Sequence, residues 1–279
     1  MTSYEIAIAV WEKAGGNKKE GCLFASLPNS FTMAAQRFFN GLSTRPRWTI
    51  DTLHFMTLAF YPTNTGLDDC LLRTVHIYKR KSGVWHESVM FTLQSGTAEF
   101  HILVDRALDL TALLPCFFSS GSFADGSWKP TLDYARAIQT QEQSQSYGEV
   151  IRTMVLPPNT PGPNQFRLNL LQLVTLLFTI GETNDGPRYH LTKMNCFWYA
   201  RTVRRAILSR YLAAQAQAEV MEPTHRNEDQ MGKCFGIRLD GSGPQGDINP
   251  LHDIQLGAII DCYCQEYDNI SMVRQVMVI

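Results

Sequence analysis

Short runs of β-branched and aromatic residues, separated by turn-forming residues, dominate the first half of the chain after a small-residue-rich start. Such runs are typical of strands, and short connections between them favour antiparallel neighbours. The runs lie at 48–61, 71–79, 84–93 and 100–104. We therefore expect an antiparallel meander that begins at Trp48.

The second half of the chain carries apolar residues at helical spacing. The segment 165–180 predicts one helix, and a second is expected to begin near Cys196 and to end near 218. Shorter helices are expected at 32–40 and around 254–267. The stripe of the second helix is formed by Cys196, Ala200, Val203, Ile207 and Tyr211. Strands that precede helices in this way predict an α+β fold, with the meander packed against the helix that bears Cys196.

Composition shifts along the chain divide it into three parts. Residues 48–215 form the predicted core, although 115–165 is rich in Ser, Gly and Pro and is expected to consist mainly of loops. Residues 1–47 are expected to form an N-terminal extension. Residues 216–279 are expected to form a C-terminal extension that packs on the core.

Charge and cysteine content narrow the class of protein. With 44% apolar residues the chain can form a core without disulfides or a structural metal, and a net charge of −1 with no basic stripe disfavours nucleic acid as a partner. Seven scattered cysteines argue against a secreted disulfide framework. No apolar run approaches the roughly 18 residues of a membrane span, so we expect a cytoplasmic protein without a transmembrane segment.

Cys196 is the strongest candidate for a reactive group. A thiol attacks as the thiolate, whose formation is favoured at a helix N-terminus and beside an imidazole. Asn195 is a good N-cap residue directly before Cys196. The strand pair upstream offers His86 and, on the next strand, His101 and Asp105. If the hairpin turns near 94–97, register counting places His86 opposite a position near Asp105; His54 and His76 are alternative bases.

The run from Tyr189 to Ala200 resembles the cysteine motif of the circularly permuted NlpC-like papain superfamily. This superfamily includes the lecithin:retinol acyltransferase family and the PPPDE-type peptidases. The motif is a Tyr, an aliphatic residue two positions later, an Asn-Cys pair and an aromatic residue three beyond the Cys. The matching residues are Tyr189, Leu191, Asn195, Cys196 and Tyr199.

The resemblance implies a catalytic His upstream on a strand and a second polar residue on the next strand. His86 and His101 match these two positions, whereas register counting favours Asp105 as the third member, and both alternatives stay open. Phe197 and Trp198 stand where acyltransferase members usually have Glu-His.

The expected activity is therefore that of a cysteine-dependent hydrolase or acyltransferase that forms a thioester with an amide, isopeptide or ester carbonyl. Its substrate would be a peptide, an amide or a lipid acyl group. No cofactor is expected, and the one-residue gap of Cys262-Tyr263-Cys264 is not zinc-finger spacing, so no metal is expected either. The alternative is a catalytically inactive papain-like domain that serves as a protein-binding module.

Overall fold

The computed structural model of the chain defines a mixed α+β fold, which agrees with the predicted class. It describes residues 31–44, 46–60, 67–80, 86–108, 129–138, 146–157, 168–183, 188–189, 195–213, 220–223, 233–234, 237–238 and 250–277. The predicted division into a core and two extensions lies partly outside these residues and stays a prediction.

An antiparallel sheet forms the centre of the molecule. Its strands lie side by side in the order β1-β5-β4-β3-β2-β6, and the short β7 (Arg188–Tyr189) pairs with β5. A separate hairpin joins β8 (Lys233–Cys234) to β9 (Ile237–Arg238). The six strands of the central order are β1 (Trp48–Thr49), β2 (Leu71–Lys79), β3 (Glu87–Ser95), β4 (Ala98–Leu108), β5 (Lys129–Ile138) and β6 (Glu149–Val155).

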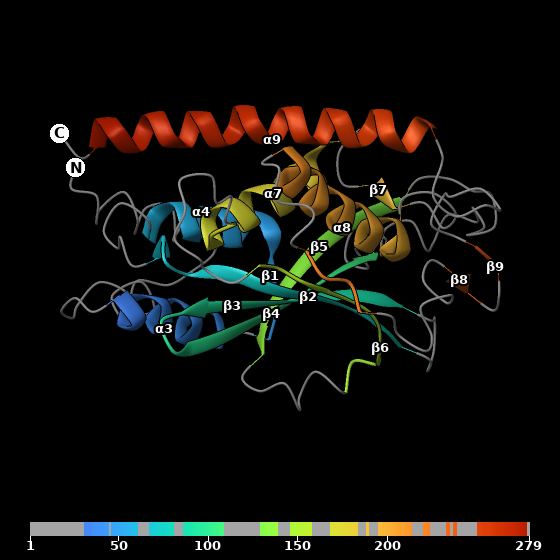
Figure 1. Cartoon of the computed structure of the whole chain (residues 1–279), viewed down its shortest axis with the longest axis horizontal. Helices are drawn as coiled ribbons and strands as arrows, with labels where there is room; N and C mark the ends of the chain where they lie inside the picture. The colour runs from blue at the N-terminus through green and yellow to red at the C-terminus, as the bar shows by residue number, and fades with distance from the viewer. Residues whose placement is uncertain are drawn as a thin grey trace, which may run out of the picture.

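Helices cover one face of this sheet in two layers (Figure 1). Helices α4 (Ile50–Phe60), α7 (Leu170–Glu182) and α8 (Cys196–Ala213) contact the strands directly, and the long α9 (Pro250–Met277) packs outside α7 and α8. Helix α3 (Phe31–Leu42) joins the same core, where Phe39 stacks on Phe100 of β4. None of the described helices combines the length and hydropathy that a membrane crossing requires.

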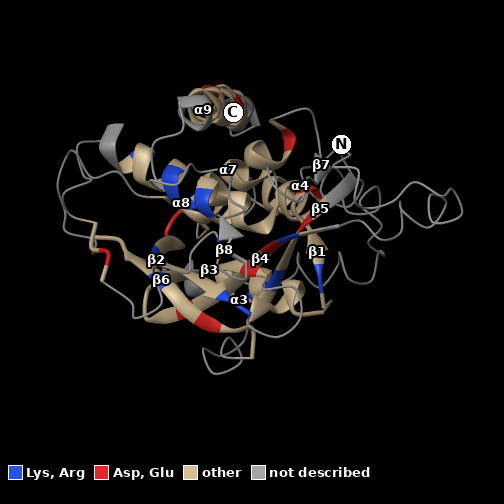
Figure 2. Cartoon of the chain, turned by 90° about the vertical axis from the view of Figure 1, so that its right-hand side faces the viewer, with Lys and Arg blue, Asp and Glu red and all other residues tan. Residues whose placement is uncertain are grey.

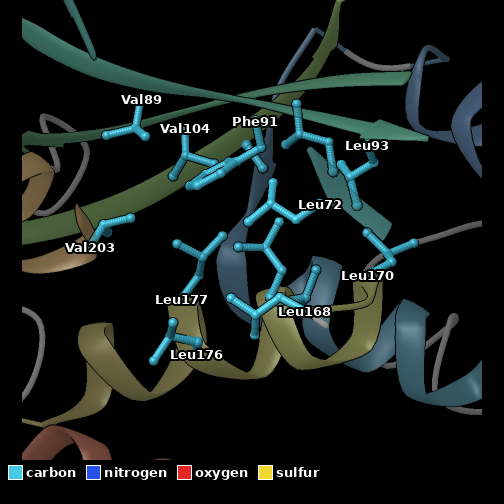
Figure 3. Close-up of a cluster of buried hydrophobic side chains, with 14 of the residues drawn as sticks. Leu72, Val89, Phe91, Leu93, Val104, Leu168, Leu170, Leu176, Leu177 and Val203 are labelled. Carbon is cyan, nitrogen blue, oxygen red and sulfur yellow. The ribbon is translucent and has the colours of Figure 1, made fainter. Parts of the chain in front are cut away.

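The core lies between the sheet and the helices. Alternate residues of β3, including Val89, Phe91 and Leu93, project toward α7 together with Val104 of β4 (Figure 3). The residues between them, such as Met90, form a second cluster with Tyr78, Leu103 and Ile138. We call the first side of the sheet the helix face and the second side the far face.

Several predicted elements agree with the structure, but the strand predicted over 48–61 is wrong. The region 115–165, which was expected to consist mainly of loops, also contains two strands that were not predicted, β5 and β6. The strand predicted at 71–79 matches β2, and the helices predicted at 32–40 and from Cys196 match α3 and α8. The run 48–61 was expected to be extended, but only Trp48 and Thr49 are; Ile50–Phe60 is helical. The Thr49 hydroxyl accepts a hydrogen bond from the backbone N–H of Thr52 at 3.2 Å, which caps this helix.

His54, one of the alternative bases, is a core histidine of α4. It is 2% exposed, its Nε2 lies 3.3 Å from the hydroxyl of Thr175, and its ring stacks on Phe178 at 4.3 Å. Burial lowers the pKa of His54 from 6.5 to about 4, so the ring is neutral at pH 7. These contacts account for His54 as part of the packing between α4 and α7.

The low pKa of His54 predicts a pH-dependent loss of stability. In the unfolded chain the imidazole takes up a proton near pH 6.5, whereas in the folded chain it does so near 4. The contribution of neutral His54 to the free energy of unfolding is therefore fully present above pH 6.5. It decreases by about 2–3 kcal/mol as the pH falls toward 4. Urea unfolding of the wild type and of His54→Gln at pH 7 and pH 4.5 measures it. An equal pH response of the two proteins would contradict the assignment.

Candidate active site around Cys196

Cys196 is the first residue of α8, and Asn195 caps the helix as predicted. The side-chain oxygen of Asn195 accepts a hydrogen bond from the backbone N–H of Trp198 at 3.0 Å, and its carbonyl accepts one from Tyr199 at 2.9 Å. A short polar side chain before a helical run satisfies the otherwise unpaired N–H groups of the first turn. The thiol therefore lies at the positive end of the dipole of an 18-residue helix.

The thiol itself is deeply buried. Cys196 is 3% exposed, and burial raises its pKa to about 12. Hydrogen bonds to the backbone of Glu87 and Phe197 lower this pKa, and the charge of Lys79 lowers it too. The charge of Glu87 raises it further. In the described arrangement the sulfur is therefore protonated at neutral pH.

The backbone contact places the sulfur at the edge of the β3–β4 ladder. The backbone N–H of Arg80 donates to the carbonyl of His86 at 2.9 Å, so the next pair, Lys79 opposite Glu87, is a non-hydrogen-bonded pair. The amide of Glu87 then points away from β2 and toward β4. Since the pairs of β3 with β4 begin only at Val89, the thiol lies beside the point where β3 starts.

His86 directly precedes Glu87, whose backbone hydrogen-bonds to the Cys196 thiol. Its Cα is two bonds, about 2.4 Å, from the Glu87 nitrogen that borders the sulfur. Strand alternation directs its side chain toward the far face, on the side of Ser88 and Met90. Burial lowers the pKa of His86; the charge of Asp105 raises this pKa, and three arginines, Arg80, Arg136 and Arg47, lower it. The imidazole is thus neutral at pH 7 and able to accept a proton.

The pairing of β3 with β4 separates His101 from His86, contrary to the expectation that the two are neighbours. His101 lies opposite Thr92, with its Nδ1 3.1 Å from the threonine hydroxyl, and the pairs of β3 with β4 run without a bulge. Asp105 lies four residues, about 13 Å, further along β4 toward the start of β3. Simple register counting therefore describes this hairpin, and Asp105, not His101, is the neighbour of His86. The carboxylate of Asp105 also pairs with Arg136 at 3.2 Å.

The remaining sequence candidates are positioned elsewhere or only in part. His76 of β2 is held by hydroxyls, with its Nδ1 2.9 Å from Thr153 and its Nε2 3.2 Å from Thr74. Tyr189 belongs to β7 and pairs with Lys129 through the backbone. Leu191 lies outside the described residues.

A row of alternating charges, which was not predicted from the sequence, crosses four strands beneath the first turn of α8. Lys79 of β2 pairs with Glu87 of β3 at 3.1 Å, and Arg106 of β4 binds Asp133 of β5 through two hydrogen bonds of 2.7 and 2.6 Å. Continuing the register from Val89 opposite Val104 places Glu87 opposite Arg106. All four side chains are buried on the helix face.

Aromatic residues of α8 cover this row of charges. The Lys79 ammonium lies 4.9 Å from the centre of the Phe197 ring, and the Arg106 guanidinium lies 5.1 and 4.9 Å from those of Trp198 and Tyr199. Such cation–π contacts stabilise a cation that has lost its water. The signal that could have revealed the row is a charged residue, Glu87, on an otherwise apolar strand face.

Further along α8 lie more basic residues (Figure 2), and one of them, Arg204, forms a more exposed ion pair with Glu222. Arg204 binds Glu222 with two hydrogen bonds of 2.6 and 2.5 Å, and both side chains keep part of their surface in water. This pair has the same chemistry as Arg106 with Asp133 but is less buried. It is therefore a matched control for substitutions of the buried pair.

The other cysteines show no metal centre within the described part of the chain. No group of three or more His, Cys, Asp or Glu side chains there is arranged to hold a metal ion. Cys264 accepts a hydrogen bond from Arg210 at 3.1 Å, and Cys262 is exposed. Cys70 is fully buried, and burial raises its pKa to about 12.

No family model matches this chain, and neither curated proteins nor solved structures give a significant match. The functional assignment therefore rests on the geometry around Cys196 and on the motif that precedes it.

Proposed function

We propose that this chain is a cysteine-dependent hydrolase or acyltransferase with Cys196 as nucleophile and His86 as base. One observation carries the proposal: the thiol, at the N-terminus of α8, hydrogen-bonds to the amide that directly follows His86. Asp105 supplies a carboxylate whose charge acts on the same imidazole. In this proposal the nucleophile, the base and the orienting group come from a helix start and two adjacent strands, as the resemblance to the permuted papain superfamily implies.

In the described structure the side chains of His86 and Asp105 lie on the far face of the sheet, whereas Cys196 lies at the start of α8 on the helix face. The proposed reaction therefore requires the start of β3 to rearrange so that the imidazole reaches the sulfur. The imidazole takes the proton from Cys196, and Asp105 stabilises the imidazolium. The thiolate attacks a carbonyl carbon, and N–H groups of the first turn of α8 stabilise the oxyanion. The bond to the leaving amine or alcohol breaks as His86 returns the proton to it. Water or another acceptor then cleaves the thioester and regenerates the thiol.

This chemistry fits an amide, isopeptide or ester carbonyl, including a lipid acyl group. Hydrolysis and transfer differ only in the acceptor that resolves the thioester. The helix-on-sheet packing and the Asn195-Cys196 lead-in support the resemblance to the permuted papain superfamily.

A second candidate function is a catalytically inactive papain-like domain that binds a protein partner. The observation that favours it is the burial of Cys196, which raises the pKa of its thiol to about 12. Phe197 and Trp198, which replace the Glu-His of acyltransferase members, pack on the buried cations instead.

Alkylation by iodoacetamide, followed for each cysteine peptide by mass spectrometry, distinguishes the two functions. An active site predicts an apparent pKa for Cys196 below 8.5, because a thiolate–imidazolium pair forms when His86 takes the proton. His86→Ala is expected to slow alkylation at pH 7 by about tenfold or more. Asp105→Asn is expected to slow it less, and His101→Ala, as the matched histidine control, to leave it unchanged.

Cys70 provides an internal reference because burial raises the pKa of both thiols to about 12. If Cys196 reacts no faster than Cys70, and His86→Ala changes neither rate, the enzyme proposal fails and the binding module is the better assignment.

A further inference from the structure

The ion pair between Lys79 and Glu87 is unusual because both side chains are completely buried. The ammonium lies 3.1 Å from the Glu87 carboxylate, contacts the backbone carbonyl of Lys233 in β8, and lies over the Phe197 ring at 4.9 Å. Removing two charges from water is costly, and replacing such a pair with apolar residues is often neutral or stabilising. Stability alone therefore gives little reason for a lysine at this place.

Both members of the pair border Cys196. Glu87 contacts the thiol through its own backbone, and the ring beneath Lys79 belongs to the residue that follows Cys196. In a site of low dielectric, a neighbouring charge strongly changes the free energy of an anion such as a thiolate. The two charged side chains that act on the pKa of the Cys196 thiol are thus a cation and an anion held in one buried ion pair.

We propose that this ion pair controls the ionisation of Cys196, with Lys79 as the residue that stabilises the thiolate once His86 has taken the proton. Lys79 acts here as a positioning residue through its charge and does not transfer a proton. Its catalytic purpose rests on the proposed function, whereas its effect on the thiol does not. The two charges act oppositely, since Lys79 lowers the pKa of Cys196 and Glu87 raises it.

Because the charges of Lys79 and Glu87 have opposite effects on the thiol, substitutions of the two residues test the inference. Lys79→Gln and Glu87→Gln each remove one charge of the buried ion pair, so both variants are expected to lose stability. Their effects on the thiol are expected to differ in direction: alkylation of Cys196 at pH 7 becomes about tenfold slower in Lys79→Gln and about tenfold faster in Glu87→Gln. Lys79→Arg keeps the charge and is expected to retain most of the wild-type rate.

The pH profile of Cys196 alkylation is measured for these variants alongside urea unfolding. Arg204→Gln and Glu222→Gln, which break the more exposed ion pair of α8, serve as controls and are expected to leave the profile unchanged. A general loosening of the fold would accelerate alkylation in both buried-pair variants, and this outcome, or no change in either, overturns the inference.

His86→Ala, measured in parallel, separates this inference from the proposed function. Opposite shifts in the ion-pair variants without any effect of His86→Ala support control by Lys79 and Glu87 but contradict the enzyme. A His86 effect with equal shifts in the two ion-pair variants supports the enzyme and contradicts the role of Lys79.

Discussion

Replacing Arg106 with methionine is expected to lower the free energy of unfolding by about 3–5 kcal/mol. The guanidinium is 2% exposed and binds both oxygens of Asp133, so its removal leaves a buried carboxylate without its cation. It also removes the cation that lies against Trp198 and Tyr199. Equilibrium unfolding in urea, followed by tryptophan fluorescence and circular dichroism, measures the loss.

Arg204→Met is the matched control, since Arg204 makes the same two-bond contact with a carboxylate that is partly in water. Its expected cost is about 1 kcal/mol or less. The double variant Arg106→Met/Asp133→Leu removes both buried charges and is expected to recover much of the stability lost by Arg106→Met. Equal losses for Arg106→Met and Arg204→Met would contradict the energetic role assigned to the buried pair.

Gly148→Ala is expected to destabilise the protein by about 3 kcal/mol and to disturb the site as well. Gly148 precedes β6 with a φ of +140°, a conformation that side chains rarely adopt. An added Cβ would lie 2.6 Å from the carbonyl carbon of Lys79 and 2.8 Å from the nitrogen of Arg80. These are backbone atoms of Lys79, the last residue of β2, and of Arg80, so they cannot move aside as the end of a flexible side chain could.

Gly257→Ala in α9 is the control for this substitution. Nothing lies within 4 Å of the position that its Cβ would take, and the residue is exposed on a helix. Alanine at such a place is expected to stabilise by about 0.5–1 kcal/mol. Urea unfolding and Cys196 alkylation are measured for both variants. Similar stabilities for the two would contradict the predicted clash beside Lys79.

The sequence predicted the elements whose signal is local. The strand at 71–79 and the helix from Cys196 follow from β-branched content and helical spacing, and Asn195 marks the helix start. The run 48–61 was misread because a buried helix and a buried strand can both be almost continuously apolar. Strands β5 and β6 were missed because charged residues such as Asp133, Arg136 and Arg152 interrupt their apolar pattern, and their partners come from distant strands.

The positions of the candidate site residues were predictable to a similar degree. Cys196, its cap and the proximity of Asp105 to His86 follow from spacing along the chain and from counting across one hairpin. The family-based expectation for His101 did not survive the register of β3 and β4. The pairing of Lys79 with Glu87 and of Arg106 with Asp133 depends on how four strands align, which no single segment specifies.

The row of alternating charges also bears on how accurately the sheet assembles. A slip of one residue between β4 and β5 would turn apolar side chains to the wrong face, but a slip of two residues would preserve the apolar pattern. Only the charges distinguish the second error, because Asp133 would then lie opposite Val104 instead of Arg106. A buried carboxylate without a cation would make that misalignment unfavourable by several kcal/mol, roughly the whole margin of a marginally stable domain. The buried charges thus disfavour a misaligned pairing that hydrophobic packing alone would tolerate.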